Sequence, residues 1–114
     1  MSSITTHVLD TSIGKPGAGI TVVLERKTHS AGWQKLAEGM TDVNGRLNDL
    51  LPPNEAFLPG HYRLVFEVGP YFLLNEQDGF FPQISIAFAV KNASEHFHVP
   101  LLLSPAGYTT YRGT

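Results

Sequence analysis

The sequence contains no cysteine among its 114 residues. This absence excludes a disulfide framework, a thiolate nucleophile and a zinc or iron–sulfur centre built from cysteine ligands. The GxSxG nucleophile elbow, the GxxxxGK phosphate loop, the HExxH helix and the GxGxxG dinucleotide motif are absent as well. The side chains that remain for chemistry are histidine, carboxylate, hydroxyl and arginine.

Charged side chains are few and nearly balanced in sign. They make up 16% of the residues and give a formal net charge of −2 at pH 7. A nucleic-acid-binding protein normally presents a basic face, so we expect no nucleic-acid partner. No apolar run approaches the roughly 18 residues of a membrane span, and Met1–Thr11 lacks the features of a signal peptide. We therefore expect a cytoplasmic protein that does not associate with membranes.

The length and the hydrophobic pattern predict one all-β domain that covers residues 1–114. A chain of this length corresponds to a single domain with an ordinary core. Glycine, proline and Asn-Gly signals separate short segments of alternating polar and apolar residues, a pattern typical of a β-sandwich. One short helix is predicted at Leu73–Gly79. The predicted strands are Ile4–Asp10, Ile20–Arg26, Lys35–Thr41, His61–Val68, Ile84–Lys91, His96–Leu103 and Tyr108–Thr114.

The segment His96–Leu103 departs from the one-sided pattern of the other strands. One parity is an ordinary core face made of Phe97, Val99, Leu101 and Leu103. The opposite parity contains His96, His98, Pro100 and Leu102, so its apolar end would lie in water in a monomer. We expect both faces to be covered, the second by another subunit.

Three features of the sequence could carry chemistry. His7 lies in a predicted strand, where a single histidine is more typical of a structural or exposed residue. His96 and His98 share one side of their strand, because side chains alternate with period two. They could supply two of three zinc ligands, or one of them could act as a general base. The pair Asn44-Gly45 suits a tight hairpin turn that would place Arg46 at the start of a strand.

Four segments of the chain resemble one known family. They are Thr6–Asp10, Thr41–Arg46, His96–Pro105 and Tyr108–Thr114, and together they look like the 5-hydroxyisourate hydrolases, also called transthyretin-related proteins. Thr114 stands where the family usually ends in serine, and Phe97 stands where tyrosine is common. Both departures keep the relevant property, a hydroxyl in one case and an aromatic ring in the other.

The resemblance implies a fold, an assembly and a reaction. The fold is an eight-stranded transthyretin-like β-sandwich with one short helix, and four copies form a homotetramer around a channel. The reaction is the hydrolysis of 5-hydroxyisourate to 2-oxo-4-hydroxy-4-carboxy-5-ureidoimidazoline, without a cofactor or a metal, in the cytoplasm or in the peroxisome of a eukaryote. Carried over residue by residue, the implied catalytic residues are His7, Arg46, His98 and Thr114. The implied substrate-binding residues are His7, Arg46, Tyr111, Arg112 and Gly113.

These residue types suit the opening of a cyclic amide. Either His98 or His7 can take a proton from water near neutral pH, and the other can orient the water or return a proton. Arg46 offers a fixed positive charge to the oxyanion that grows during attack. His96 is not among the residues carried over from the family. Two alternatives stay open: a transthyretin-like carrier that binds a small ligand without reaction, and a zinc hydrolase that uses His7, His96 and His98.

Overall fold

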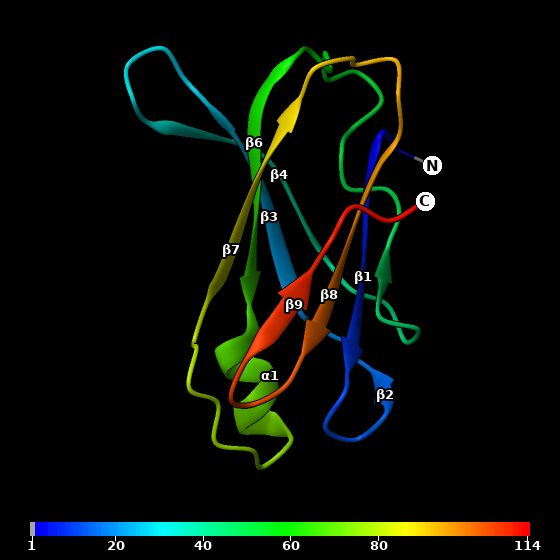
Figure 1. Ribbon diagram of the computed structural model, residues 1–114, viewed down its shortest axis with the longest axis vertical. Coiled ribbons are helices and arrows are strands. Elements are labelled where there is room, and N and C mark those ends of the chain that lie inside the picture. Colours follow the sequence, from blue (N-terminus) through cyan, green and yellow to red (C-terminus); the bar gives the residue numbers. More distant parts are fainter. Residues whose placement is uncertain (1) are drawn as a thin grey trace.

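Two β-sheets packed face to face form the body of the protein, with one helix at an end of the sandwich (Figure 1). The computed structural model describes residues 2–114. In chain order the elements are β1 (Ile4–Asp10), β2 (Lys15–Pro16), β3 (Thr21–Lys27), β4 (Trp33–Met40), β5 (Arg46–Leu47), β6 (Gly60–Glu67), α1 (Val68–Leu74), β7 (Ile84–Val90), β8 (Phe97–Leu103) and β9 (Tyr108–Thr110).

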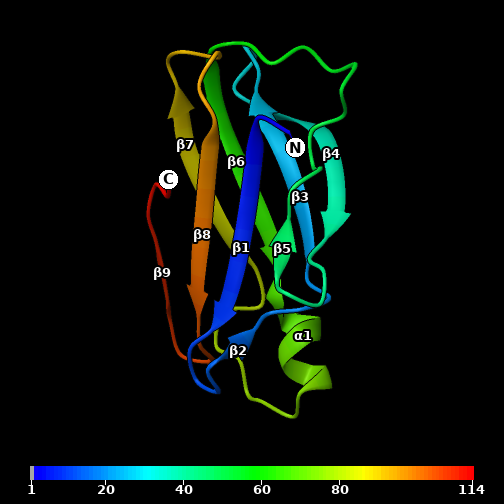
Figure 2. The same ribbon diagram turned by 90° about the vertical axis from the view of Figure 1, so that its right-hand side faces the viewer.

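The first sheet contains strands from both the start and the end of the chain. Its strand order is β2-β1-β8-β9, with β5 also paired to β1, whereas the second sheet has the order β4-β3-β6-β7. Figure 2 shows β1 and β8 side by side in one layer, in front of β3 and β6. The two strands run parallel, and their register places Thr5 opposite His98 and His7 opposite Pro100. Residues about ninety positions apart in the sequence thereby become neighbours.

Alternation along the strands decides which side chains form the core. In β1, Ile4 and Val8 are fully buried between the sheets, while His7 on the opposite parity is only half-buried. The second sheet supplies the other half of the same hydrophobic cluster from its inward parity, with Val22, Leu24, Leu64, Phe66 and Ile86. The outward parity of the first sheet carries polar side chains such as His7 and His98 beside apolar ones such as Leu102.

The predicted all-β architecture is confirmed, with small differences in strand ends. Ile4–Asp10 coincides with β1, and the other core strands agree to within two residues. Within residues 2–114 there are nine strands where eight were expected, because the two-residue β2 pairs with the end of β1. The last predicted strand stops at Thr110, although Gly113 still forms an isolated bridge with His98.

The helix prediction is wrong in position. The sequence pattern places a helix at Leu73–Gly79, but α1 occupies Val68–Leu74 and begins directly after β6. Burial decides the location, because Val68, Tyr71 and Phe72 recur at helical spacing and pack into the core. The polar residues that follow form the turn that ends the helix, in which Glu76 has a φ of 56°.

The predicted hairpin at Asn44-Gly45 is also wrong, although the tight turn is present. Gly45 has a φ of 74°, and its amide donates a 2.9 Å hydrogen bond to the Asp42 carbonyl. The flanking strands β4 and β5 lie in different sheets, so the turn passes from one sheet to the other. A Cβ atom at Gly45 would lie 2.3 Å from the Val8 carbonyl oxygen, so only glycine fits there.

A buried polar network fastens α1 to the end of β1. The Asp10 carboxylate is fully buried and accepts hydrogen bonds from the Tyr71 hydroxyl at 2.7 Å and the Ser12 hydroxyl at 2.5 Å. Gln77 in turn donates to the Ser12 hydroxyl at 3.0 Å. A buried carboxylate is stable only when its oxygens are hydrogen-bonded, so these contacts fix where the helix lies.

The network predicts a pH-dependent loss of stability in Tyr71→Phe. Removal of the hydroxyl leaves a buried carboxylate oxygen without this donor, and we expect the unfolding free energy to fall by about 1.5–3 kcal/mol at pH 8. Burial and the bond to Asp10 raise the pKa of Tyr71 above its ordinary value of 10.0. The stabilisation by the Tyr71 hydroxyl is therefore complete below pH 10 and falls progressively as the pH rises above 10. The difference in unfolding free energy between wild type and Tyr71→Phe is accordingly smaller at pH 11 than at pH 8. Urea unfolding at both pH values measures it, and a difference that stays constant contradicts the prediction.

Candidate active site

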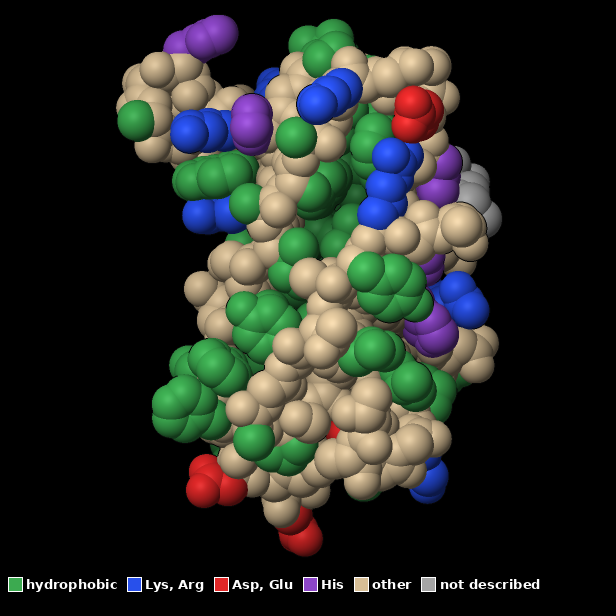
Figure 3. All heavy atoms as spheres, viewed as in Figure 1, with side chains coloured by type: hydrophobic (Ala, Val, Ile, Leu, Met, Phe, Trp, Pro, Cys, Tyr) green, Lys and Arg blue, Asp and Glu red, His purple; other side chains and the backbone are tan. Residues whose placement is uncertain are grey.

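Strand register gathers three of the predicted site residues on the outer face of the first sheet. Arg46 in β5 pairs with His7 in β1, and His98 in β8 lies across from Thr5, two residues before His7 on the same face. Arg46 is exposed, and both histidines are half-buried. Figure 3 shows histidine side chains along the right-hand edge, over the region where β1 and β8 lie in Figure 1, with Lys or Arg side chains beside them.

The turn before β5 positions both Arg46 and His7. The Asp42 carboxylate accepts hydrogen bonds from the backbone N–H groups of Asn44 at 2.8 Å and Arg46 at 3.0 Å. These bonds, the one from Arg46 first, lower the pKa of Asp42, which therefore stays ionised at neutral pH. The Asn44 carbonyl lies 3.0 Å from His7 Nε2. Because a carbonyl only accepts, His7 carries a proton on Nε2, and in the neutral ring Nδ1 holds the lone pair.

His98 is held as a neutral imidazole. Burial is the largest influence that lowers its pKa below the ordinary value of 6.5, followed by the positive charge of Arg46 and the rings of His96 and His7. A hydrogen bond with the Thr5 backbone acts in the opposite direction and raises this pKa. His98 Nδ1 lies 2.8 Å from the Thr5 hydroxyl. A half-buried ring that is uncharged at neutral pH can accept a proton from water.

The C-terminal segment returns to His98. The Gly113 amide donates a 2.8 Å hydrogen bond to the His98 carbonyl, which brings Thr114 to this end of the face. A Cβ atom at Gly113 would lie 2.6 Å from His98 Cδ2 and 3.1 Å from Pro100 Cγ. The position therefore requires glycine, because any side chain would displace the His98 ring. Thr114 itself is exposed.

The Arg112 guanidinium is held by partners near the start of β8, and Arg112 lines the same groove as His98. It donates a 2.9 Å hydrogen bond to Glu95 within an ion pair, and it lies 4.5 Å from the centre of the Phe97 ring. These contacts fasten the C-terminal segment to the start of β8. Tyr111, whose side chain is 56% exposed, lines an apolar groove of about 200 Å³ between β7 and the segment, and His98 lines the same groove.

Sequence reasoning missed two residues that position the site. Asp42 had a local signal, because an aspartate two residues before Asn-Gly commonly caps a turn with its carboxylate. Thr5 shares the parity of His7 in β1, but its contacts are to His96 and His98. Those contacts depend on the pairing of β1 with β8, which alternation within either strand does not reveal.

The zinc alternative has no matching geometry in the described part of the chain. Within residues 2–114 no group of three or more His, Cys, Asp or Glu side chains is placed to hold a metal ion. The Nε2 atom of His7 faces the Asn44 carbonyl, while His96 and His98 both face Thr5.

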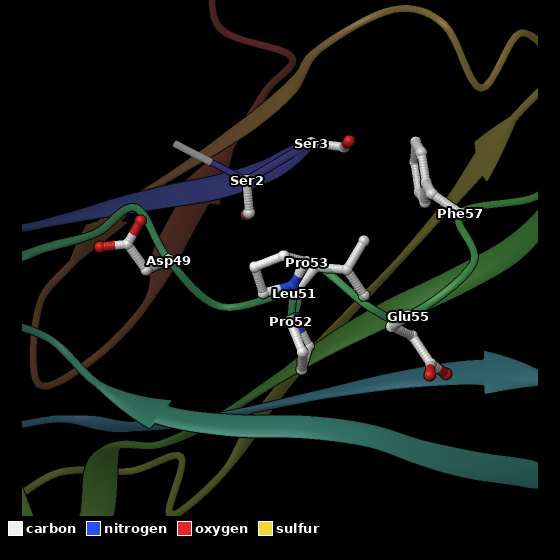
Figure 4. A pocket seen from close by; sticks show the side chains of 8 residues that line it. All are labelled: Ser2, Ser3, Asp49, Leu51, Pro52, Pro53, Glu55 and Phe57. Atoms are coloured by element: carbon white, nitrogen blue, oxygen red, sulfur yellow. The ribbon is translucent and has the colours of Figure 1, made fainter.

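A larger hollow lies elsewhere and contains none of the predicted site residues. It has a volume of about 380 Å³ and is bordered by residues of the N-terminus and of the 49–57 loop, among them Asp49, Pro53 and Phe57 (Figure 4).

Among residues 2–114, no helix is long and apolar enough to cross a membrane.

The two packed sheets have the architecture of the transthyretin class of fold, and histidine and arginine lie on the outer face of its β5-β1-β8 sheet. The family model described as "HIUase/Transthyretin family" matches residues 4–113. The chain therefore belongs to the HIUase/Transthyretin family, as its sequence motifs predicted.

Three known proteins show where the chain lies within this family. It is 47% identical over 111 residues to the 5-hydroxyisourate hydrolase of Salmonella typhimurium, covering 97% of this chain and 80% of that protein. The structure of Klebsiella pneumoniae 5-hydroxyisourate hydrolase aligns with a TM-score of 0.85 and 34% identity over the full length of both chains. Sea bream transthyretin in complex with thyroxine aligns with a TM-score of 0.92 and 27% identity, covering 99% of this chain and 96% of that one.

The electrostatics of the site predict that Arg46→Gln raises the pKa of His98. The substitution removes the positive charge that opposes protonation of the ring, while burial remains. Nuclear magnetic resonance titration of the His98 ring measures the change. Lys35→Gln is the control, because Lys35 lies in β4 of the other sheet and is paired with Glu38. Equal His98 titration curves in wild type and Arg46→Gln would contradict the prediction.

Proposed function

We propose that the protein hydrolyses 5-hydroxyisourate to 2-oxo-4-hydroxy-4-carboxy-5-ureidoimidazoline. The observation that carries the proposal is the convergence of His7, Arg46 and His98 on one face, in a chain 47% identical to a 5-hydroxyisourate hydrolase. On this proposal the protein is a cyclic amide hydrolase that works without a cofactor. Its site of action is the cytoplasm, or the peroxisome in a eukaryote.

Two histidines with different surroundings divide the proton transfers. His98, with its lowered pKa, accepts a proton from water. The oxygen of that water adds to the amide carbonyl carbon, the carbon–nitrogen bond of the ring breaks, and a proton passes to the leaving nitrogen. His7 orients the water by accepting a hydrogen bond at Nδ1, or returns a proton from Nδ1 when the ring is doubly protonated, because its Nε2–H is engaged by the Asn44 carbonyl. Because the bond that breaks lies in a ring, one product contains all the atoms of water and substrate.

Arg46 stabilises the charge that develops during attack. Its guanidinium stays protonated and presents a planar set of donors, which suits the carbonyl and enolic oxygens of the substrate. The Asp42 carboxylate holds the backbone of this residue, so the charge is positioned before substrate binds. Removal of one such donor typically costs about 2.7–4 kcal/mol of transition-state stabilisation.

We assign the C-terminal segment to substrate binding. Thr114 contributes its hydroxyl or its carboxylate beside His98, and Gly113 allows the close approach. Tyr111 offers a hydroxyl at the rim. Arg112 acts by holding the segment in place through Glu95 and Phe97.

We further propose that the active form is a homotetramer. Arg46 is exposed, and His7 and His98 are only half-buried on an outer sheet face, so a second subunit is needed to enclose a substrate there. The strands β7 and β9 end their sheets, which leaves two edges for pairing with another copy. A carrier role is the second candidate, because sea bream transthyretin, of closely similar fold, is in complex with thyroxine.

The hydrolase proposal predicts that this protein accelerates the ultraviolet decay of freshly generated 5-hydroxyisourate. His98→Ala and Arg46→Ala should each lower kcat/KM by about a hundredfold or more. His61→Ala is the control, because His61 is exposed in β6 of the other sheet. A carrier would bind the compound and leave its decay rate unchanged. A folded, assembled His98→Ala protein with the wild-type rate would refute the assignment of the base.

The placement of Thr114 predicts that a Gly-Ser-Gly-Ser tail fused after it abolishes most of the activity. The tail displaces the carboxylate and crowds the face beside His98. Thr114→Ser is the matched variant, which keeps the hydroxyl and the carboxylate and should retain the rate. Light scattering should give both proteins the mass of four 12.5 kDa chains. An extended tetramer with full activity would show that Thr114 lies outside the site.

A further inference from the structure

Thr5 bridges two histidines that the proposed chemistry treats separately. Its hydroxyl oxygen lies 2.8 Å from His98 Nδ1 and 2.9 Å from His96 Nε2. The side chain is only 2% exposed, so it is shielded from bulk water. The β1–β8 register creates the bridge, because Thr5 lies opposite His98 and His96 precedes it by two residues.

A single hydroxyl proton cannot be donated to both rings at once. In one arrangement His96 Nε2–H donates to Thr5, and Thr5 donates to His98 Nδ1, so that His98 carries its own proton on Nε2. In the other, His98 Nδ1–H donates to Thr5, and Thr5 donates to His96. His98 Nε2 then holds the lone pair that a base requires. The second arrangement becomes the first when His98 Nε2 gains a proton, protons shift from His98 through Thr5 to His96 Nε2, and His96 loses a proton from Nδ1.

We propose that Thr5 and His96 form a proton relay with His98, an inference that rests on the proposed hydrolysis. When His98 Nε2 takes a proton from water, its Nδ1 proton moves to the Thr5 oxygen and the Thr5 proton moves to His96 Nε2. His98 returns to a neutral ring that carries hydrogen on Nε2, and the positive charge now lies on His96. Thr5 and His96 are thus positioning residues, since neither has to touch the substrate.

The surroundings of the rings favour transfer in this direction. His96 is exposed, whereas His98 is half-buried and shares its face with Arg46 and His7. A positive charge is better solvated on the exposed ring, which can release the proton to water. The guanidinium of Arg112 donates to the His96 carbonyl at 3.3 Å and is itself paired with Glu95.

The relay also distinguishes the role of His98 from that of His7. His7 has a backbone carbonyl as its partner, and a carbonyl cannot pass a proton onward. His98 has a hydroxyl, which both accepts and donates. His98 is therefore the ring that can be restored to a neutral state through the protein while substrate covers its other side.

The test compares Thr5→Val with Thr5→Ser in the assembled protein. Valine keeps the shape and removes the hydroxyl, and we expect kcat to fall about tenfold to a hundredfold with a smaller change in KM. Serine keeps the hydroxyl and should stay within a few fold of wild type. Equal losses in both variants, or no loss in valine, would overturn the relay.

Two further measurements distinguish a relay from a structural role. His96→Ala, at an exposed position, should lower kcat, and added imidazole should restore part of the rate by accepting the proton from Thr5. His29→Ala, an exposed histidine in the β3–β4 hairpin, is the control and should show neither effect. A His96→Ala rate that does not respond to imidazole contradicts the relay.

A spectroscopic measurement tests the relay without relying on enzyme activity. The nitrogen-15 shifts of the His98 ring report which nitrogen carries hydrogen, and they should change in Thr5→Val but not in Thr5→Ser. If wild type fails to hydrolyse 5-hydroxyisourate, the proposed function is wrong, and the shifts still decide whether Thr5 sets the protonation of His98. Unchanged shifts in Thr5→Val would refute the inference even in an active enzyme.

Discussion

The parallel pairing of β1 with β8 is the contact on which the rest of the site depends. It joins a strand near the start of the chain to one near its end, with seven paired positions from Ile4 to Asp10. A shift of one residue would turn His98 into the core and expose Val99. The buried parity of both strands therefore fixes the register, and the same register sets Thr5 beside His98. The same register therefore sets both the packing of the core and the geometry of the candidate site.

The polar face gains its chemistry from unequal surroundings of similar side chains. His7, His96 and His98 lie on the same face, yet their hydrogen-bond partners are a carbonyl for His7 and a shared hydroxyl for the other two. After burial, the positive charge of Arg46 is the largest influence that lowers the pKa of His98. The Asp42 carboxylate accepts hydrogen bonds from the backbone of the turn that precedes β5 and positions Arg46. The arrangement keeps one ring neutral beside a permanent positive charge, which suits activation of water.

Alternation of side chains predicted the strands because each sheet has one buried face, and β1 was predicted to the residue. The helix and the Asn44-Gly45 hairpin were misplaced for the same physical reason. Polar residues after Leu74 resemble a solvated helix, but burial of Tyr71 and Phe72 places α1 earlier. The turn itself was recognised from its glycine, yet only the packing of two sheets determines that β4 and β5 separate. The conformational preferences of neighbouring residues predict that a turn forms, but they do not predict which strands the turn connects.

The sequence by itself predicted the sandwich class, because alternation depends only on spacing along the chain, and its motifs identified the family. The resemblance to that family, rather than residue type or spacing, singled out His7, Arg46 and His98 as candidate site residues. Tertiary structure alone decided that Thr5 links His96 to His98 and that the Arg112 guanidinium binds Glu95. The Thr5 contacts join two segments that lie about ninety positions apart in the sequence. Strand register and the burial of apolar faces create them, and neither can be read from one segment in isolation.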